Sequence, residues 1–150
     1  MQIVRRSMPC LIAAGLMLGS APAWAADVAW RNTTPGPSPT APDGSYSFEG
    51  TSNFAGEEVK ITGKGVRTII PSGRTSAGET VYRFADGSGF TLRFVAARIG
   101  GTVHQAGVFL NGTGRYAGII GSAIGVPESR ADANSPGSPN WRGSYELLKE

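Results

Sequence analysis

The sequence has little cysteine, little histidine and few charged side chains. Of its 150 residues one is cysteine, one is histidine, and charged residues account for 17%. Cys10 lies in an N-terminal segment that we expect to be removed, so the mature chain would have no disulfide and no thiol chemistry. His104 alone does not supply the three or four ligands of a zinc site. The sequence therefore predicts no metal and no cofactor, and the domain must be held together by its core.

Positive charge is neither abundant nor clustered. The 14 basic and 11 acidic residues give a net charge of +3, which falls to about +1 without Arg5 and Arg6. Nonspecific binding of nucleic acid needs clustered cations, and the remaining arginines are scattered singly along the chain. We therefore expect no nucleic-acid partner.

The first 25 residues have the pattern of an export signal. Two arginines precede an apolar run at 11–18, and Ala23-Trp24-Ala25 supplies small residues at the cleavage site. The run is shorter than the ~20 residues of a membrane span, so we expect none in the mature form. A buried N-terminal helix is the alternative. The pattern predicts cleavage near Ala25 and a secreted or periplasmic protein.

Glycine and proline divide the rest of the chain into short segments. The chain has 22 glycines and 10 prolines, and four of the prolines lie between Thr33 and Pro42. We interpret 26–43 as an N-terminal arm with a Pro-rich linker, the alternative being a first strand that packs by Trp30, and 44–150 as one domain. Residues 127–140 form a second Pro/Gly/Ser-rich loop.

From Gly44 onward, apolar and polar side chains alternate with the period of a β-strand. Glycine-containing turns separate the alternating segments, notably Asp86–Gly89, Gly100-Gly101 and Asn111-Gly112, while Gly63 and Gly65 suggest a bulge or a bend within one segment. The expected strands are 45–50, 57–70, 79–85, 90–99, 102–110, 115–126 and 141–148, with 27–32 as a further strand in the alternative to the arm.

Consecutive strands joined by tight turns form an antiparallel meander, whose apolar face must be covered. Closure of the sheet covers that face and removes exposed strand edges. We predict an all-β fold, a single antiparallel up-and-down β-barrel of about eight strands, with a β-sandwich as the alternative.

The segment Gly112-Thr-Gly-Arg-Tyr-Ala-Gly118, followed by Gly121, resembles a signature of the allene oxide cyclase barrel-like and dirigent-like proteins. Gly143-Ser144-Tyr145 is similar to their closing strand. The resemblance implies an eight-stranded antiparallel barrel in which these glycines have structural roles. Plant members cyclise an epoxide or steer radical coupling in an apolar cavity, whereas many bacterial relatives have no assigned activity.

Aromatic residues in phase along the strands are the largest feature of the domain, and they fit either a filled core or the wall of a cavity. His104 is either a hydrogen-bonded strand residue or a polar group inside that cavity, since it alternates in phase with Ala106, Val108 and Leu110. The candidate cavity residues are Tyr46, Phe48, Tyr82, Phe84, Phe94, His104, Tyr116 and Tyr145.

No catalytic residue is predicted, because the sequence lacks a nucleophile elbow and the adjacent Glu57 and Glu58 point to opposite faces of a strand. We expect a non-catalytic exported protein that binds a small apolar ligand or a protein partner. An oligomer is compatible with the sequence, which shows no interface. One alternative is an isomerase or cyclase that acts by confining its substrate. The other is a structural envelope protein whose barrel is filled.

Overall fold

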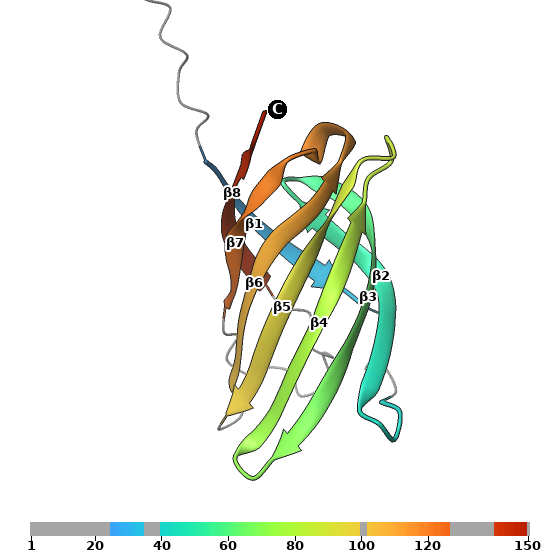
Figure 1. The fold of residues 1–150 in the computed structure, drawn as a ribbon, viewed down its shortest axis with the longest axis vertical. Helices are drawn as coiled ribbons and strands as arrows, with labels where there is room; N and C mark the ends of the chain where they lie inside the picture. The colour runs from blue at the N-terminus through green and yellow to red at the C-terminus, as the bar shows by residue number, and fades with distance from the viewer. Residues whose placement is uncertain (1–24, 35–39, 100–101, 127–139, 150) are drawn as a thin grey trace, which may run out of the picture.

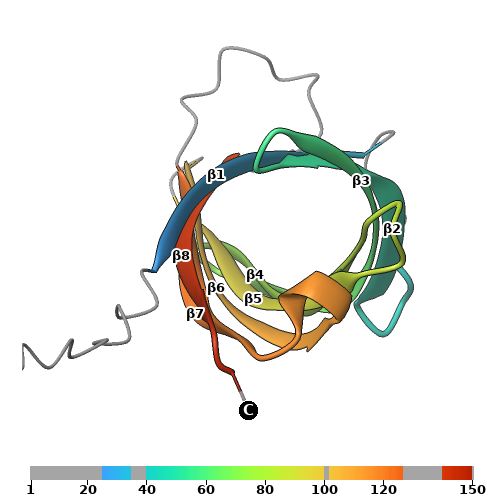
Figure 2. The ribbon, with the colours of Figure 1, turned by 90° about the horizontal axis from the view of Figure 1, so that it is seen from above.

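A computed structural model of the chain describes residues 25–34, 40–99, 102–126 and 140–149. In these residues eight antiparallel strands form one closed barrel, as predicted (Figures 1 and 2). The elements are β1 (Ala26–Thr33), β2 (Ser45–Phe54), β3 (Glu57–Ile70), β4 (Gly73–Arg83), β5 (Gly89–Ile99), β6 (Thr102–Thr113), the short 3₁₀ turn η1 (Gly114–Tyr116), β7 (Ile119–Val126) and β8 (Asn140–Leu147).

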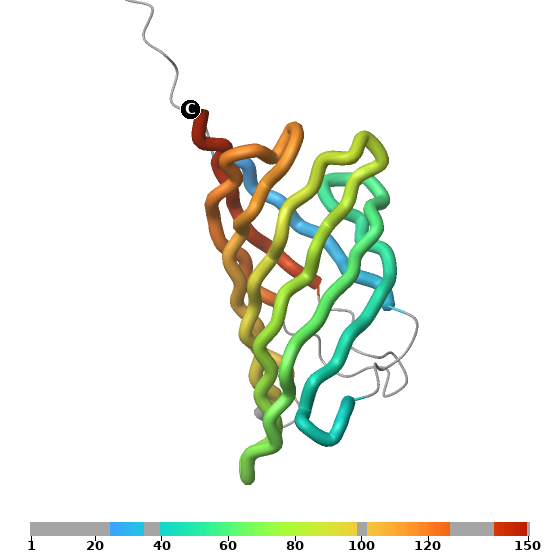
Figure 3. The backbone as a smooth tube through the Cα atoms, turned by 45° about the vertical axis from the view of Figure 1, so that its right-hand side comes forward, coloured from blue at the N-terminus to red at the C-terminus, as the bar shows by residue number. Residues whose placement is uncertain are grey.

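Each strand pairs with its neighbours in sequence, and β8 closes the barrel on β1, where Trp30 lies opposite Trp141. The strands differ in length: β3 has 14 residues, whereas β1, β7 and β8 have eight each. The longer strands β3–β6 therefore run past β1, β7 and β8 at one end of the molecule (Figure 3). The register shows this directly, because β6 pairs with β7 only as far as Gln105 and Gly125.

Alternation decides which side chains fill the barrel. Phe90, Leu92 and Phe94 of β5 are buried, whereas Arg93 and Val95 between and beside them are exposed. The same period holds along the other strands, as expected for a sheet with one covered face. The buried apolar side chains of the described residues form a single core: Val28, Trp30, Phe54, Val59, Ile61, Tyr82, Phe84, Phe90, Leu92, Phe94, Phe109, Tyr116, Ile119, Ala123 and Trp141.

The barrel begins earlier in the chain than the sequence suggested. Residues 26–33, interpreted as part of an arm, form β1 and pair with both β2 and β8. Trp30 is only 4% exposed and lies within the core. The domain therefore starts at Ala26 rather than Gly44, because burial of this large ring outweighs the extended character of the segment that follows.

Two expectations about glycines were wrong. Gly63 and Gly65 lie in an unbroken β3 and pair regularly with β2 and β4, so neither marks a bulge or a bend. Asn111-Gly112 is not a hairpin turn, because β6 continues to Thr113. Between Gly89 and Thr91 the β5–β6 register shifts, and Asn111 has a φ of 54° in the left-handed region. These features make residues 110–112 a β-bulge.

The turn between β6 and β7 lies at Gly114–Gly118, so the strand expected over 115–126 begins only at Ile119. Gly114 and Gly118 both have positive φ, which favours glycine at these positions. Tyr116, expected in that strand, instead turns inward from η1 and is buried.

Among the described residues, no helix has the length and apolarity needed to cross a membrane. The predicted export signal up to Trp24, including Cys10, and most of the predicted loop at 127–140 lie outside the described residues.

Candidate functional site

The barrel interior has two different ends. One end, which we call the closed end, lies beside the β2–β3, β4–β5 and β6–β7 turns and is filled by aromatic rings. Phe90 is central, with ring centroids 4.7 Å from Tyr82 and 4.9 Å from Phe54. Phe84 and Tyr116, 4.7 Å apart, complete the layer. Rings at these separations leave no room for a ligand among them.

A charged side chain covers the closed end from outside. The Arg115 guanidinium lies 4.5 Å above the Phe84 ring and donates a hydrogen bond to the Glu57 carboxylate. Asp86 lies 3.6 Å from the same guanidinium. A cation over the ring face and two carboxylates beside it hold Arg115 across the turns.

Below these rings, Trp30, Tyr82 and Asn32 form a buried hydrogen-bonded chain. The Trp30 indole Nε1 donates to the Tyr82 hydroxyl at 2.9 Å, and that hydroxyl donates to Asn32 Oδ1 at 3.1 Å. Burial raises the pKa of Tyr82 to about 12, although both hydrogen bonds act in the opposite direction. This hydroxyl therefore stays protonated at neutral pH and serves the core.

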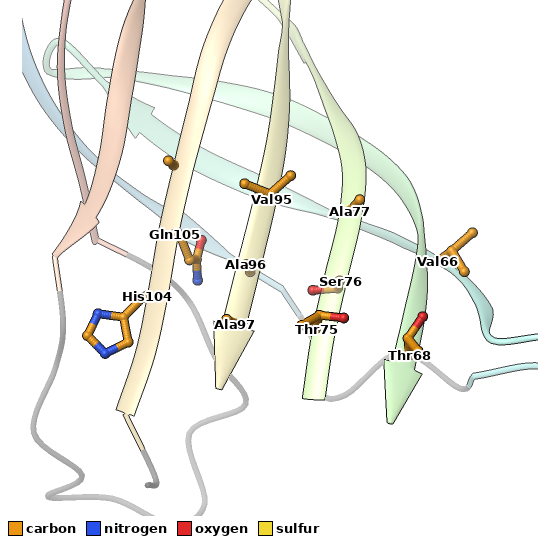
Figure 4. A pocket seen from close by; sticks show the side chains of 11 residues that line it. Val66, Thr68, Thr75, Ser76, Ala77, Val95, Ala96, Ala97, His104 and Gln105 are labelled. Atoms are coloured by element: carbon orange, nitrogen blue, oxygen red, sulfur yellow. The ribbon is translucent and has the colours of Figure 1, made fainter. Parts of the chain in front are cut away.

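The opposite end, which we call the open end, is lined by small and half-buried residues. The alternation that turns core residues inward continues along these strands to the open end. Four partly exposed residues therefore face the interior there: Ser76 and Gly78 of β4, Ala96 of β5 and Gln105 of β6. Figure 4 shows Ala96 and Gln105 on the far side of their strands from Val95. Solvent therefore reaches the inner face of the sheet at this end.

Two aromatic rings at the open end lie along the wall of the barrel. Phe48 is paired with Gly63, and Tyr46 with Gly65. A Cβ atom at Gly63 would lie 2.1 Å from the Phe48 ring, and one at Gly65 would lie 2.7 Å from the Tyr46 hydroxyl. The rings thus occupy the space left by the missing side chains on the neighbouring strand, which keeps them out of the centre of the barrel.

A depression of about 720 Å³ lies over β3–β6 and is lined mainly by outward-facing residues, together with Ser76, Ala96 and Gln105 (Figure 4). Its central row crosses the sheet through direct register pairs, from Val66 to Ala77, Val95 and Ala106. Val66 is 52% exposed and Val95 60% exposed. This row is an apolar strip on the outside of the barrel.

The expectation that His104 lines an interior cavity was wrong. His104 is exposed and lies on the outer face beside Ala97, its register partner. On β6 it is Phe109 that enters the core, with Gln105 in the same phase. Both faces of this strand carry apolar residues, so the sequence alone did not distinguish inside from outside.

The other seven candidates face the interior, but at different depths. Tyr82, Phe84 and Tyr116 belong to the closed end, and Phe94 and Tyr145 lie between the two ends against the core. Only Tyr46 and Phe48 line the open end. The structure thus does not bring the predicted set together as one cavity wall.

Sequence reasoning missed the polar residues of the open end. Ser76, Arg98 and Gln105 lie in phase with buried residues on the same strands, and Arg67 places its guanidinium 4.7 Å above the Tyr46 ring. If the alternation of the buried residues had been continued to the ends of the strands, it would have predicted that these residues face the interior. Within the described ranges, no group of three His, Cys, Asp or Glu side chains is placed to hold a metal ion.

No family model, no curated protein and no solved structure matches this chain. The resemblance of residues 112–121 to the allene oxide cyclase barrel-like and dirigent-like proteins stays a prediction.

Proposed function

We propose that this chain is a non-catalytic binding protein that takes a small, largely apolar ligand into the open end of its barrel. The observation that carries the proposal is the position of the Tyr46 and Phe48 rings, which lie against Gly65 and Gly63 of the neighbouring strand. If the Tyr46 and Phe48 rings filled the interior, they would extend across it, as the rings of the closed end do. An eight-stranded barrel has room for one small ligand when its inner wall is built this way.

The chemistry of the open end suits binding better than proton transfer. Its inward-facing groups are two aromatic rings, small side chains, the Gln105 amide and arginine guanidiniums. Rings and glycine backbone offer apolar contact, and amide and guanidinium groups orient a ligand by hydrogen bonds. Guanidiniums remain charged at physiological pH, so they hold a ligand without exchanging protons with it.

The export signal predicted at 1–25 implies that binding takes place outside the cytoplasm. An exported binding protein meets its ligand in the periplasm or the surrounding medium. Mass spectrometry of the intact protein, purified from its own host under native conditions, would show added mass from a retained ligand.

Two neighbouring alanines allow a matched test of the site. Ala96 faces the interior at the open end and Ala97 faces outward. We expect the mature protein to enhance the fluorescence of N-phenyl-1-naphthylamine, a neutral apolar probe. Ala96→Trp would fill the open end and weaken probe binding by about tenfold or more, because a well-packed interior has no space for both groups. Ala97→Trp would leave the affinity nearly unchanged.

Circular dichroism and thermal unfolding of both variants check that each keeps the barrel. Equal probe affinity in Ala96→Trp and the unmodified protein would contradict the proposal. Loss of binding in Ala97→Trp alone would place the probe on the outer apolar strip instead.

A further inference from the structure

Three arginines from consecutive strands lie on the inner face of the open end. On β4, Arg74 is on the same face of the strand as buried Thr80, and on β5, Arg98 is on the same face as buried Leu92. On β3, Arg67 is on the same face as buried Ile61. The three arginine side chains are half-buried. Their positions place three positive charges at one end of the interior.

Arg74 and Arg98 are direct register partners on adjacent strands. Directly opposed residues on one face have Cβ atoms about 4.5–5.5 Å apart, and like charges in this position destabilise a sheet. Arg67 lies one row further in, paired with Ser76. Repulsion among these cations is relieved by an anion placed between them.

The guanidinium of Arg67 is already held in place. It lies over the Tyr46 ring, and its Nη1 donates a hydrogen bond to Thr40 Oγ1. A guanidinium has five N–H groups, so the groups other than the one that donates to Thr40 keep their capacity to donate. A donor fixed in this way loses little conformational entropy when an anion binds.

Arg98 has a donor without an acceptor. Its Nε is shielded from solvent and has no hydrogen-bond partner among the residues that the structure describes. Leaving such a group unpaired is costly, more so when the group is charged. Arg74 has a further interaction of its own, so the argument depends on Arg98 and Arg67. The carboxylates within β2 and β4, Glu49 and Glu79, point to the outer face, and Asp43 before β2 accepts hydrogen bonds from Ser45.

We propose that the open end binds a tetrahedral oxyanion, a phosphate or sulfate group, with Arg98 and Arg67 as its donors. A tetrahedral group presents oxygens in several directions and therefore meets donors from separate strands, whereas one carboxylate matches a single guanidinium fork. The inference rests on the proposed function and names the polar part of the ligand, whose apolar body would lie against Tyr46 and Phe48.

The first test uses the mature chain and inorganic anions. Phosphate and sulfate are titrated at constant ionic strength against sodium chloride, with melting temperature and calorimetric binding as readouts. We expect saturable binding and a rise in melting temperature with either anion. Arg98→Gln should weaken binding by about tenfold or more, and Arg98→Lys by less, since it keeps the charge without the fork.

Arg83→Gln is the matched control, because Arg83 lies on β4 but is exposed and in the outward phase. It should bind the anions as the unmodified chain does. The site would be refuted if chloride stabilises the protein as well as phosphate does, or if folded Arg98→Gln binds phosphate with unchanged affinity.

A second experiment distinguishes a failure of the anion site from a failure of the proposed apolar-ligand function. 1-Naphthyl phosphate should bind more tightly than inorganic phosphate, and Ala96→Trp should remove that advantage. Equal affinities would keep the anion site and overturn the apolar-ligand proposal. Binding of N-phenyl-1-naphthylamine in the absence of any phosphate or sulfate binding would overturn the anion site alone.

Discussion

Trp30 and Tyr82, 52 residues apart in the chain, are joined by a hydrogen bond of 2.9 Å between the indole nitrogen and the phenol oxygen. The bond connects β1 with β4 across the interior, since these strands are not neighbours in the sheet. Both side chains are almost fully buried. The pair therefore fixes the first strand, which the sequence left in doubt, against the far wall of the barrel.

Tyr82→Phe should destabilise the barrel by about 1–3 kcal/mol, because it leaves the Trp30 N–H and Asn32 Oδ1 buried without the hydroxyl they share. Denaturant unfolding measures the change. Tyr46→Phe, at the half-buried open end, is the control and should change the free energy of unfolding much less. Equal effects of the two substitutions would show that the buried chain has no special role.

Stability should fall between about pH 10 and pH 12. The pKa of Tyr82 is raised from 10.0 to about 12 by burial, so over this range the unfolded chain releases a proton that the folded chain retains. The stabilisation is complete below pH 10 and is lost as the pH rises to the folded pKa, an effect of roughly 2–3 kcal/mol. Unfolding free energies measured across this range should decline less steeply in Tyr82→Phe. Parallel curves for the two proteins would contradict the assignment.

Gly118→Ala should cost more stability than Gly87→Ala. Both glycines have positive φ, 75° and 82°. A Cβ at Gly118 would lie 2.2 Å from the Leu148 carbonyl oxygen, whereas one at Gly87 would meet nothing within 4 Å. Gly87→Ala therefore carries only the conformational cost, about 1–2 kcal/mol. Chemical denaturation of both variants compares them, and an equal loss would rule out the steric contribution.

His104→Ala should change the free energy of unfolding by less than about 0.5 kcal/mol, because the imidazole is exposed on the outer face. Phe109→Ala, on the same strand but in the core, should cost about 3–5 kcal/mol. Thermal and denaturant unfolding measure both. A large loss in His104→Ala would mean that the imidazole makes a structural contact.

The inner face of a strand could be predicted from the sequence where polar side chains marked the outer face. In β5, polar Thr91 and Arg93 alternate with Phe90, Leu92 and Phe94, which identified the inner face correctly. In β6 both phases carry apolar residues, and the bulge at residues 110–112 changes the phase near the end of the strand. Alternation gives two faces but does not say which one is covered, so His104 was assigned to the wrong side.

The candidate site was less predictable than the fold because its residues come from separate strands. Arg67, Arg74 and Arg98 are scattered singly in the sequence, which is why the sequence indicated no cluster of positive charge. Arg74 and Arg98 meet only because β4 and β5 pair in one particular register. A register shift of one residue would have turned an arginine to the outer face.

By itself, the sequence determined that the chain forms antiparallel strands whose apolar face has to be covered, and it predicted closure into a barrel over a β-sandwich because closure also removes exposed strand edges. Tertiary structure alone decided where the interior is filled and where it is open. Ring packing filled the end near Phe90, and paired glycines held Tyr46 and Phe48 against the wall at the other. Those outcomes depend on which residues oppose one another across strands, a relationship that local pattern does not contain.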